Sequence, residues 1–127
     1  MRKEVENWWM QAKKDLEAAE KNLKIGEYYL VAFLCQQAVE KALKALYIQK
    51  KRQSPGQTHP LTKLARDCGV QKKYTTFLRH LTSEYFLSRY PDATEDVPYM
   101  MYEEEDVKNY INQSKEVLDW VASRIEK

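Results

Sequence analysis

The stretch GEYYLVAFLCQQAVEKALKAL, residues 26–46, decides the fold. From Tyr28 to Cys35 it is apolar on every side of a helix, and beyond that point its apolar residues recur every three or four positions. Gln37, Lys41 and Lys44 occupy the remaining side. A helix that is apolar all round is typically buried. The sequence therefore predicts a central, most buried helix over residues 27–51.

Two predicted helices flank this central one. Apolar residues spaced by three or four positions, from Val5 to Leu23, predict a first helix over residues 3–25 that ends at Gly26. After the loop QSPGQTHP, residues 53–60, a short helix is expected to reach Gly69. Thr58 or His59 would cap it and Pro60 would lie in its first turn.

Two further helices are expected in the second half of the chain. The stripe from Tyr74 to Tyr85 predicts a helix over residues 71–89, which stops before Pro91 because proline disfavours the helical conformation of the preceding residue. A loop, PDATEDVPYMMY, follows it. The acidic run at 103–106 suits a helix N-terminus, and the stripe behind it continues to Ile125.

Composition and pattern together predict one all-α domain over residues 1–127. The chain of 127 residues has 43% apolar residues but only three glycines and four prolines, too few turn formers for many short strands. No segment alternates polar and apolar residues between turns. The expected architecture is an up-and-down four-helix bundle with one additional short helix.

Several classes of protein are excluded by what the sequence lacks. Cys35 and Cys68 form neither a disulfide framework nor a zinc motif, and the chain has no phosphate-loop, GxSxG or HExxH motif. We therefore expect no metal and no cofactor. The N-terminal residues are charged and no apolar run is long enough for a membrane span, which favours a cytoplasmic protein without membrane contact.

The charge is divided unevenly along the chain. Residues 1–90 hold 17 basic and 9 acidic residues, a difference of +8, whereas residues 91–127 hold 4 and 10, a difference of −6. A polyanion site on the basic part would explain this division, and so would attraction between helices of the same molecule.

Two groups of residues could bind phosphate. Lys41 and Lys44 share one face of the central helix, although the same face could simply be solvated, with Glu40 and Lys44 as an ordinary pair. His59 lies at the start of the short helix, where backbone N–H groups favour an anion, and it could equally serve as a cap or a packing residue.

A third group ends the helix over residues 71–89. Tyr85 and Arg89 are four positions apart and so share a face, and Tyr90 follows directly. Arginine offers a planar fork for phosphate and tyrosine a ring on which a base can stack, so these residues suit a nucleotide. In the alternative interpretation, Arg89 only bonds the last carbonyls of its own helix.

These groups, in this order, resemble the HEPN domain (higher eukaryotes and prokaryotes nucleotide-binding). The resemblance is carried by Trp8 and Ala12 in the first helix, residues 26–46, THPLTKL at 58–64 and SEYFLSRYPDA at 83–93. It implies a helical bundle that usually forms a homodimer. Small prokaryotic members often pair with a minimal nucleotidyltransferase as a toxin–antitoxin module. The 12% aromatic content also favours a dimer, since we expect a core this small to leave part of it exposed.

Many members of the wider family are metal-independent ribonucleases with an Arg-x4–6-His motif. Here Arg89 has no histidine at that spacing, and the only formal match, Arg52 with His59, lies in a loop. No catalytic residue is therefore assigned. The leading hypothesis is a protein that binds a nucleotide or RNA and partners a nucleotidyltransferase. The alternatives are a ribonuclease that uses Arg89 or Arg52 with His59 or His80 as general acid/base, and a helical adaptor without a ligand.

Overall fold

The computed structural model describes residues 2–56, 60–93 and 96–125. Within these residues all regular structure is helical, which confirms the predicted all-α class. The α-helices are α1 (Lys3–Lys24), α2 (Tyr28–Lys51), α3 (Leu61–Cys68), α4 (Thr75–Leu87) and α5 (Glu104–Arg124), and the 3-10 turns are η1 (Lys72–Tyr74), η2 (Pro91–Ala93) and η3 (Pro98–Met100).

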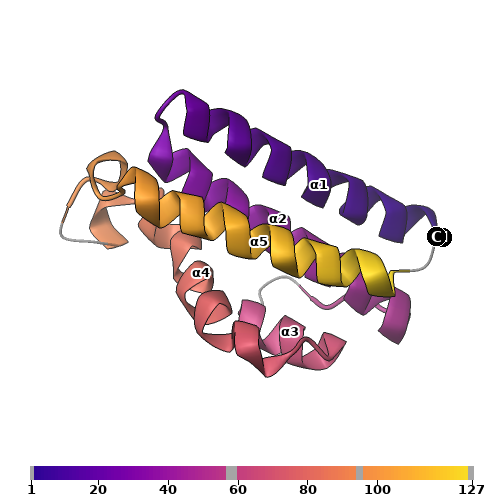
Figure 1. Ribbon diagram of the computed structural model, residues 1–127. Helices are drawn as coiled ribbons and strands as arrows, with labels where there is room; N and C mark the ends of the chain where they lie inside the picture. The colour runs from indigo at the N-terminus through magenta and orange to yellow at the C-terminus, as the bar shows by residue number, and fades with distance from the viewer. Residues whose placement is uncertain (1, 57–59, 94–95, 126–127) are drawn as a thin grey trace.

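Helix α2 lies at the centre of the bundle, as its sequence predicts. The long helices α1, α2 and α5 run side by side, and α3 and α4 cover another side of α2 (Figure 1). Val39, Leu43 and Leu46 are fully buried. Burying side chains of this size contributes about 1.5–3 kcal/mol each relative to exposure, so α2 organises the core.

Glycine ends two helices where the sequence predicts it. Gly26 follows α1 with a φ of 78°, and its N–H donates to the carbonyl of Leu23 at 3.2 Å. Gly69 follows α3 with the same φ. This left-handed conformation costs glycine little because it has no Cβ, so these two positions turn the chain sharply.

The start of α3 differs from the prediction. The helix begins at Leu61, with Pro60 preceding its first turn, and Thr58 and His59 lie outside the described residues. The N–H of Leu61 donates to Oγ1 of Thr82 in α4, at 3.1 Å. The cap of this helix is thus supplied by a side chain 21 residues away, a contact that no local pattern indicates.

The predicted helix over residues 71–89 is also corrected. It divides into η1 and α4, which ends at Leu87, because a tighter 3-10 turn buries Tyr74 before the α-helix starts. The segment 91–102, expected to be a loop, contains η2 and η3.

The acidic run forms a helix start, which confirms its interpretation from sequence. Glu103 lies at the N-cap of α5, and Glu104 to Asp106 form its first turn. The backbone N–H of Glu103 donates to the Asp106 carboxylate at 3.4 Å, within a capping box. Of the helices in the described part of the chain, none combines the length and apolar character that crossing a membrane requires.

Candidate functional site

Arg89 lies just beyond α4 and is held against three aromatic rings. Its Nε donates to the main-chain carbonyl of Tyr85 at 2.8 Å, which confirms that it bonds the end of its own helix. The guanidinium carbon lies 4.2 Å from the centre of the Tyr85 ring and 4.9 Å from that of Tyr90. The third ring belongs to Phe33 of α2, at 4.8 Å. We call these four residues the Arg89 cluster.

The rings of the Arg89 cluster extend to the surface. Tyr85 packs edge-on against Phe86, with ring centres 4.9 Å apart, and Phe86 also contacts Tyr90 at 6.2 Å. Phe86 is 58% exposed and Tyr90 44%. A flat ligand could therefore stack on these rings without any rearrangement of the core.

The charge of Arg89 is not neutralised within the described residues. No ion pair described among them joins a carboxylate to the guanidinium, and the hydrogen bond described for it is that of Nε. Arginine is always charged and carries five N–H donors in a rigid fork. The Arg89 cluster thus combines an uncompensated planar cation with exposed rings, a combination suited to a phosphate that carries a base.

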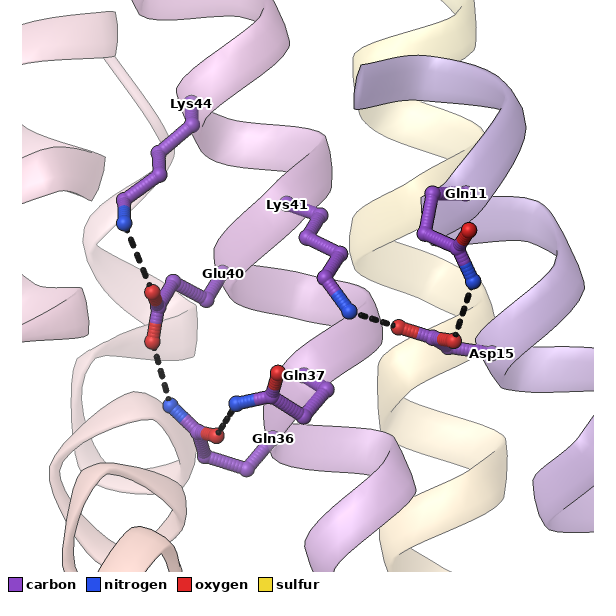
Figure 2. Close-up of polar contacts among 7 residues, drawn as sticks. All are labelled: Gln11, Asp15, Gln36, Gln37, Glu40, Lys41 and Lys44. Carbon is purple, nitrogen blue, oxygen red and sulfur yellow. Dashed lines mark hydrogen bonds and ion pairs between the residues drawn. The ribbon is translucent and has the colours of Figure 1, made fainter. Parts of the chain in front are cut away.

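The two predicted lysines have carboxylate partners. Figure 2 shows Lys41 reaching across to Asp15 of α1, which also accepts a hydrogen bond from Gln11 at 2.9 Å. Lys44 pairs with Glu40 at 2.8 Å, and its ammonium lies 5.3 Å from the centre of the Trp8 ring. Both lysines therefore tie α2 to α1 or to its own preceding turn.

The alternative interpretation, in which these lysines lie on a solvated face, is wrong for Lys44. The Glu40–Lys44 pair exists, but Lys44 is only 6% exposed. Glu40 also accepts from Gln36, which is 3% exposed and in turn accepts from Gln37 (Figure 2). The polar face of α2 is thus a hydrogen-bonded network in which Gln36 and Lys44 are buried, and the ring of Trp8 in α1 lies against the Lys44 ammonium.

The contacts of the described residues do not join Lys41 and Lys44 to Arg89. The two groups contact the same side of α2 at different positions along the helix. Phe33 belongs to the Arg89 cluster, and Glu40, the partner of Lys44, follows it by seven residues, or two helical turns. The structure brings together Tyr85, Arg89 and Tyr90 of the predicted site. The sixth predicted residue, His59, lies outside the described residues.

The remaining histidine offers no catalytic geometry in the described structure. His80 is exposed on α4, and its side chain makes no hydrogen bond or ion pair with a described residue. Arg52 follows α2 in a left-handed conformation with φ 56°. Across residues 2–56, 60–93 and 96–125, no three His, Cys, Asp or Glu side chains are grouped as metal ligands.

A buried carboxyl lies directly before Tyr85 of the Arg89 cluster in the sequence. Glu84 of α4 is 5% exposed, and burial raises the pKa of its carboxyl above the ordinary 4.5, an effect that the nearby Tyr102 hydroxyl opposes. Neither Oε2 of Glu84 nor the Tyr102 hydroxyl has a partner in hydrogen-bond geometry within the described residues. Burial also raises the pKa of Tyr102. The Glu84 carboxyl and the Tyr102 hydroxyl thus lie close together in the interior.

Sequence reasoning missed Phe33, Phe86 and Asp15. Phe33 lies inside an all-apolar run, where nothing separates a core residue from one beside a site. Phe86 is adjacent to Tyr85, and the alternation of aromatic and basic residues in YFLSRY is a signal that could have included it. Asp15 is one of many charged residues on α1, and only the packing of α1 on α2 selects it.

Comparisons with known proteins agree with this fold. Residues 5–125 match the family model of the HEPN domain. The crystal structure of TT1696 from Thermus thermophilus superposes with a TM-score of 0.87 at 26% identity, over 98% of this chain and 100% of that one. ST0689, an archaeal HEPN homologue, gives 0.79 at 33% identity, over 99% and 100%. No curated protein matches the sequence. These matches cover nearly the whole length of the chain and agree with the observed helices and their order. The chain therefore belongs to the HEPN domain family.

Proposed function

We propose that this HEPN protein binds a nucleotide, or the end of an RNA, at the Arg89 cluster. The observation that carries the proposal is the stacking of the Arg89 guanidinium on Phe33, Tyr85 and Tyr90 without a carboxylate partner among the described residues. Arg89 would bind phosphate, and Tyr85 or Tyr90 would stack on the base. Lys41 and Lys44 are assigned instead to the contact between α1 and α2.

The chemistry of the Arg89 cluster favours binding over turnover. Because Nε is held by a carbonyl, the guanidinium plane is fixed before a ligand arrives, which lowers the entropic cost of binding phosphate. A general acid or base would have to lie within hydrogen-bond reach of the scissile phosphate. The described neighbours of Arg89 are aromatic, so the proposal assigns no catalytic step.

The proposal includes a homodimer. Nine large apolar side chains are exposed among the described residues, and seven of them fall within residues 85–101. Four of the seven, Val97, Tyr99, Met100 and Met101, lie outside the proposed ligand site, and such a group is typical of a surface that contacts another protein. The proposed heterologous partner is a nucleotidyltransferase in a toxin–antitoxin-type module, a role suggested by the small size and HEPN membership of the chain.

Titration with AMP, ATP and a short oligoribonucleotide tests the ligand. We expect binding that weakens with salt, and Arg89→Ala should weaken it by about 1–3 kcal/mol, the contribution of a charge-assisted hydrogen bond. Arg124→Ala is a matched control, since Arg124 also ends a helix and lies 4.9 Å from an aromatic ring, that of Trp120. Equal affinities of the wild type and Arg89→Ala would remove Arg89 from the site.

The same titration separates binding from cleavage. An oligoribonucleotide recovered intact after incubation supports a binding protein, whereas cleavage lost in Arg89→Ala would support the ribonuclease alternative. The partner is tested first by whether a neighbouring gene encodes a nucleotidyltransferase, and then by co-expression of that protein with this one, followed by light scattering of the purified proteins. Two separate species at micromolar concentration would contradict that part of the proposal.

A further inference from the structure

The basic residues of the chain are concentrated in one part of the fold. Residues 50–83 contain eight lysines and arginines and a single acidic residue, Asp67, a difference of +7. They comprise the end of α2, all of α3 and η1, and the first two turns of α4. Asp67 pairs with Lys63 on α3 at 3.4 Å, so the acidic charge in this region is already engaged.

A cleft of about 400 Å³ opens between α3 and α4 in this basic region. Arg66 of α3 and Lys72 of η1 line it, together with the hydroxyl-bearing side chains of Thr62 and Thr75. Neither Arg66 nor Lys72 is paired with a carboxylate of the described residues. Two free cations beside hydroxyl donors in a concave surface match the chemistry of a phosphate diester.

One exposed face of α4 connects this cleft to the Arg89 cluster. Thr75, Arg79, Ser83, Phe86 and Tyr90 follow one another at spacings of four, four, three and four residues, and all are exposed. Residues at these spacings lie on the same side of a helix. The 12 steps from Thr75 to Leu87 along α4 correspond to about 18 Å at 1.5 Å per residue. The cleft and the cluster thus lie at the two ends of one helix, with a further arginine between them.

We propose that the ligand of this protein is a single-stranded nucleic acid several nucleotides long, lying along the exposed face of α4. Arg66 and Lys72 hold a backbone phosphate in the α3–α4 cleft, Arg79 contacts the backbone midway, and a base stacks at Phe86 or Tyr90. The part of this proposal that concerns the Arg89 cluster rests on the proposed function, whereas the part that concerns the cleft rests on the residues that line the cleft. A surface that combines cations for the backbone with rings for the bases is typical of proteins that bind single strands.

Fluorescence anisotropy with labelled strands of about ten nucleotides tests this proposal, with one RNA and one DNA of the same sequence and with AMP as the short ligand. The variant is Arg66→Gln combined with Lys72→Gln. Lys14→Gln combined with Lys21→Gln is the matched control, because it removes the same charge from the exposed side of α1, where both lysines pair with Glu17.

We expect the α3–α4 variant to bind the long strand about 10-fold more weakly and to bind AMP with unchanged affinity. The slope of log affinity against log salt should become shallower by about 0.7, because the contact with one phosphate is lost. The control variant should keep the wild-type slope. An equal loss in both variants would show that only the overall charge matters and would overturn the proposal, as would an unchanged affinity of the α3–α4 variant.

The outcomes for the two sites are distinguishable. Weaker AMP and strand binding in Arg89→Ala, with no effect in the α3–α4 variant, would retain the Arg89 site and reject the path along α4. Strand binding that depends on Arg66 and Lys72 but not on Arg89 would support the cleft and reject the proposed function. Preference of the wild type for the RNA over the DNA strand would identify contact with the 2′-hydroxyl.

Discussion

Arg89 and Tyr85 are joined twice: the Nε of the arginine donates to the tyrosine carbonyl at 2.8 Å, and the guanidinium lies 4.2 Å from the centre of the tyrosine ring. The hydrogen bond fixes the position of the cation, and the ring supports one of its faces. Since the two residues are one helical turn apart, the arrangement is set by α4 itself. A ligand would meet a guanidinium that is already oriented.

Removal of the Tyr85 ring tests this arrangement. Tyr85→Leu retains an apolar side chain but loses the ring contacts with Arg89, Phe33 and Phe86. We expect the free energy of unfolding to fall by about 1 kcal/mol and the affinity for AMP to fall as well. Tyr85→Phe keeps the ring and should resemble the wild type in both urea denaturation and calorimetric titration. Similar losses in both variants would assign the effect to the hydroxyl.

The buried Glu40–Lys44 pair should be more sensitive to the loss of one partner than of both. Glu40→Gln leaves the Lys44 ammonium, whose side chain is 8% exposed, without its carboxylate. We expect a decrease of about 1–3 kcal/mol in the free energy of unfolding, measured by urea denaturation. Combining it with Lys44→Met should recover most of this loss, because no buried charge then remains. A double variant as unstable as the sum of the single variants would contradict this account.

Glu84 should make the stability depend on pH in a defined direction. Because burial raises its folded pKa, the folded state holds this proton more tightly than the unfolded state, so the contribution of Glu84 is most favourable below the ordinary pKa. That contribution is lost as the pH rises through the folded pKa. Glu84→Gln cannot ionise, so its stability relative to the wild type should increase from acidic to neutral pH. Denaturation curves at several pH values check this, and a constant difference would exclude Glu84 as the cause.

The exposed apolar residues of 97–101 should control self-association. Tyr99→Asp introduces a charge into this surface, and we expect it to convert a homodimer into a 15.1 kDa monomer in light scattering. Met10→Asp changes a residue of similar exposure, 55%, on α1 and outside this surface. The control should therefore remain dimeric. A wild type that is itself monomeric at micromolar concentration would reject the dimer.

The helices were predictable because periodicity and glycine act locally. Gly26 and the stripe of α2 depend on neighbours within a few residues, and the structure confirms both. The cap of Leu61 by Thr82 was not predictable, since it arises only when α3 and α4 pack together. The break between η1 and α4 has the same origin, because burial of Tyr74 outweighs the tendency to continue one helix.

Only those residues of the site that are close together in the sequence could be predicted as a group. Tyr85, Arg89 and Tyr90 are neighbours in sequence, so their spacing already placed them together, whereas Phe33 enters from another helix. Lys44 illustrates the converse error. A lysine on the polar side of a helix is normally interpreted as solvated, and the sequence does not reveal that the ring of Trp8 in α1 lies against the Lys44 ammonium.

The bond between Asp15 and Lys41 has a consequence for how α1 and α2 find their alignment. Asp15 is 7% exposed, and Lys41 of α2 supplies its opposite charge. If α1 slipped along α2 by one turn, about 5.4 Å, Gln11 or Ala19 would face Lys41 instead. Asp15 would then be buried without a cation, at a cost that apolar contacts of similar area cannot offset. The ion pair thus specifies one register of the α1–α2 hairpin and disfavours the adjacent registers. The alanines and leucines of the interface are interchangeable, so they are poorly suited to distinguish these registers.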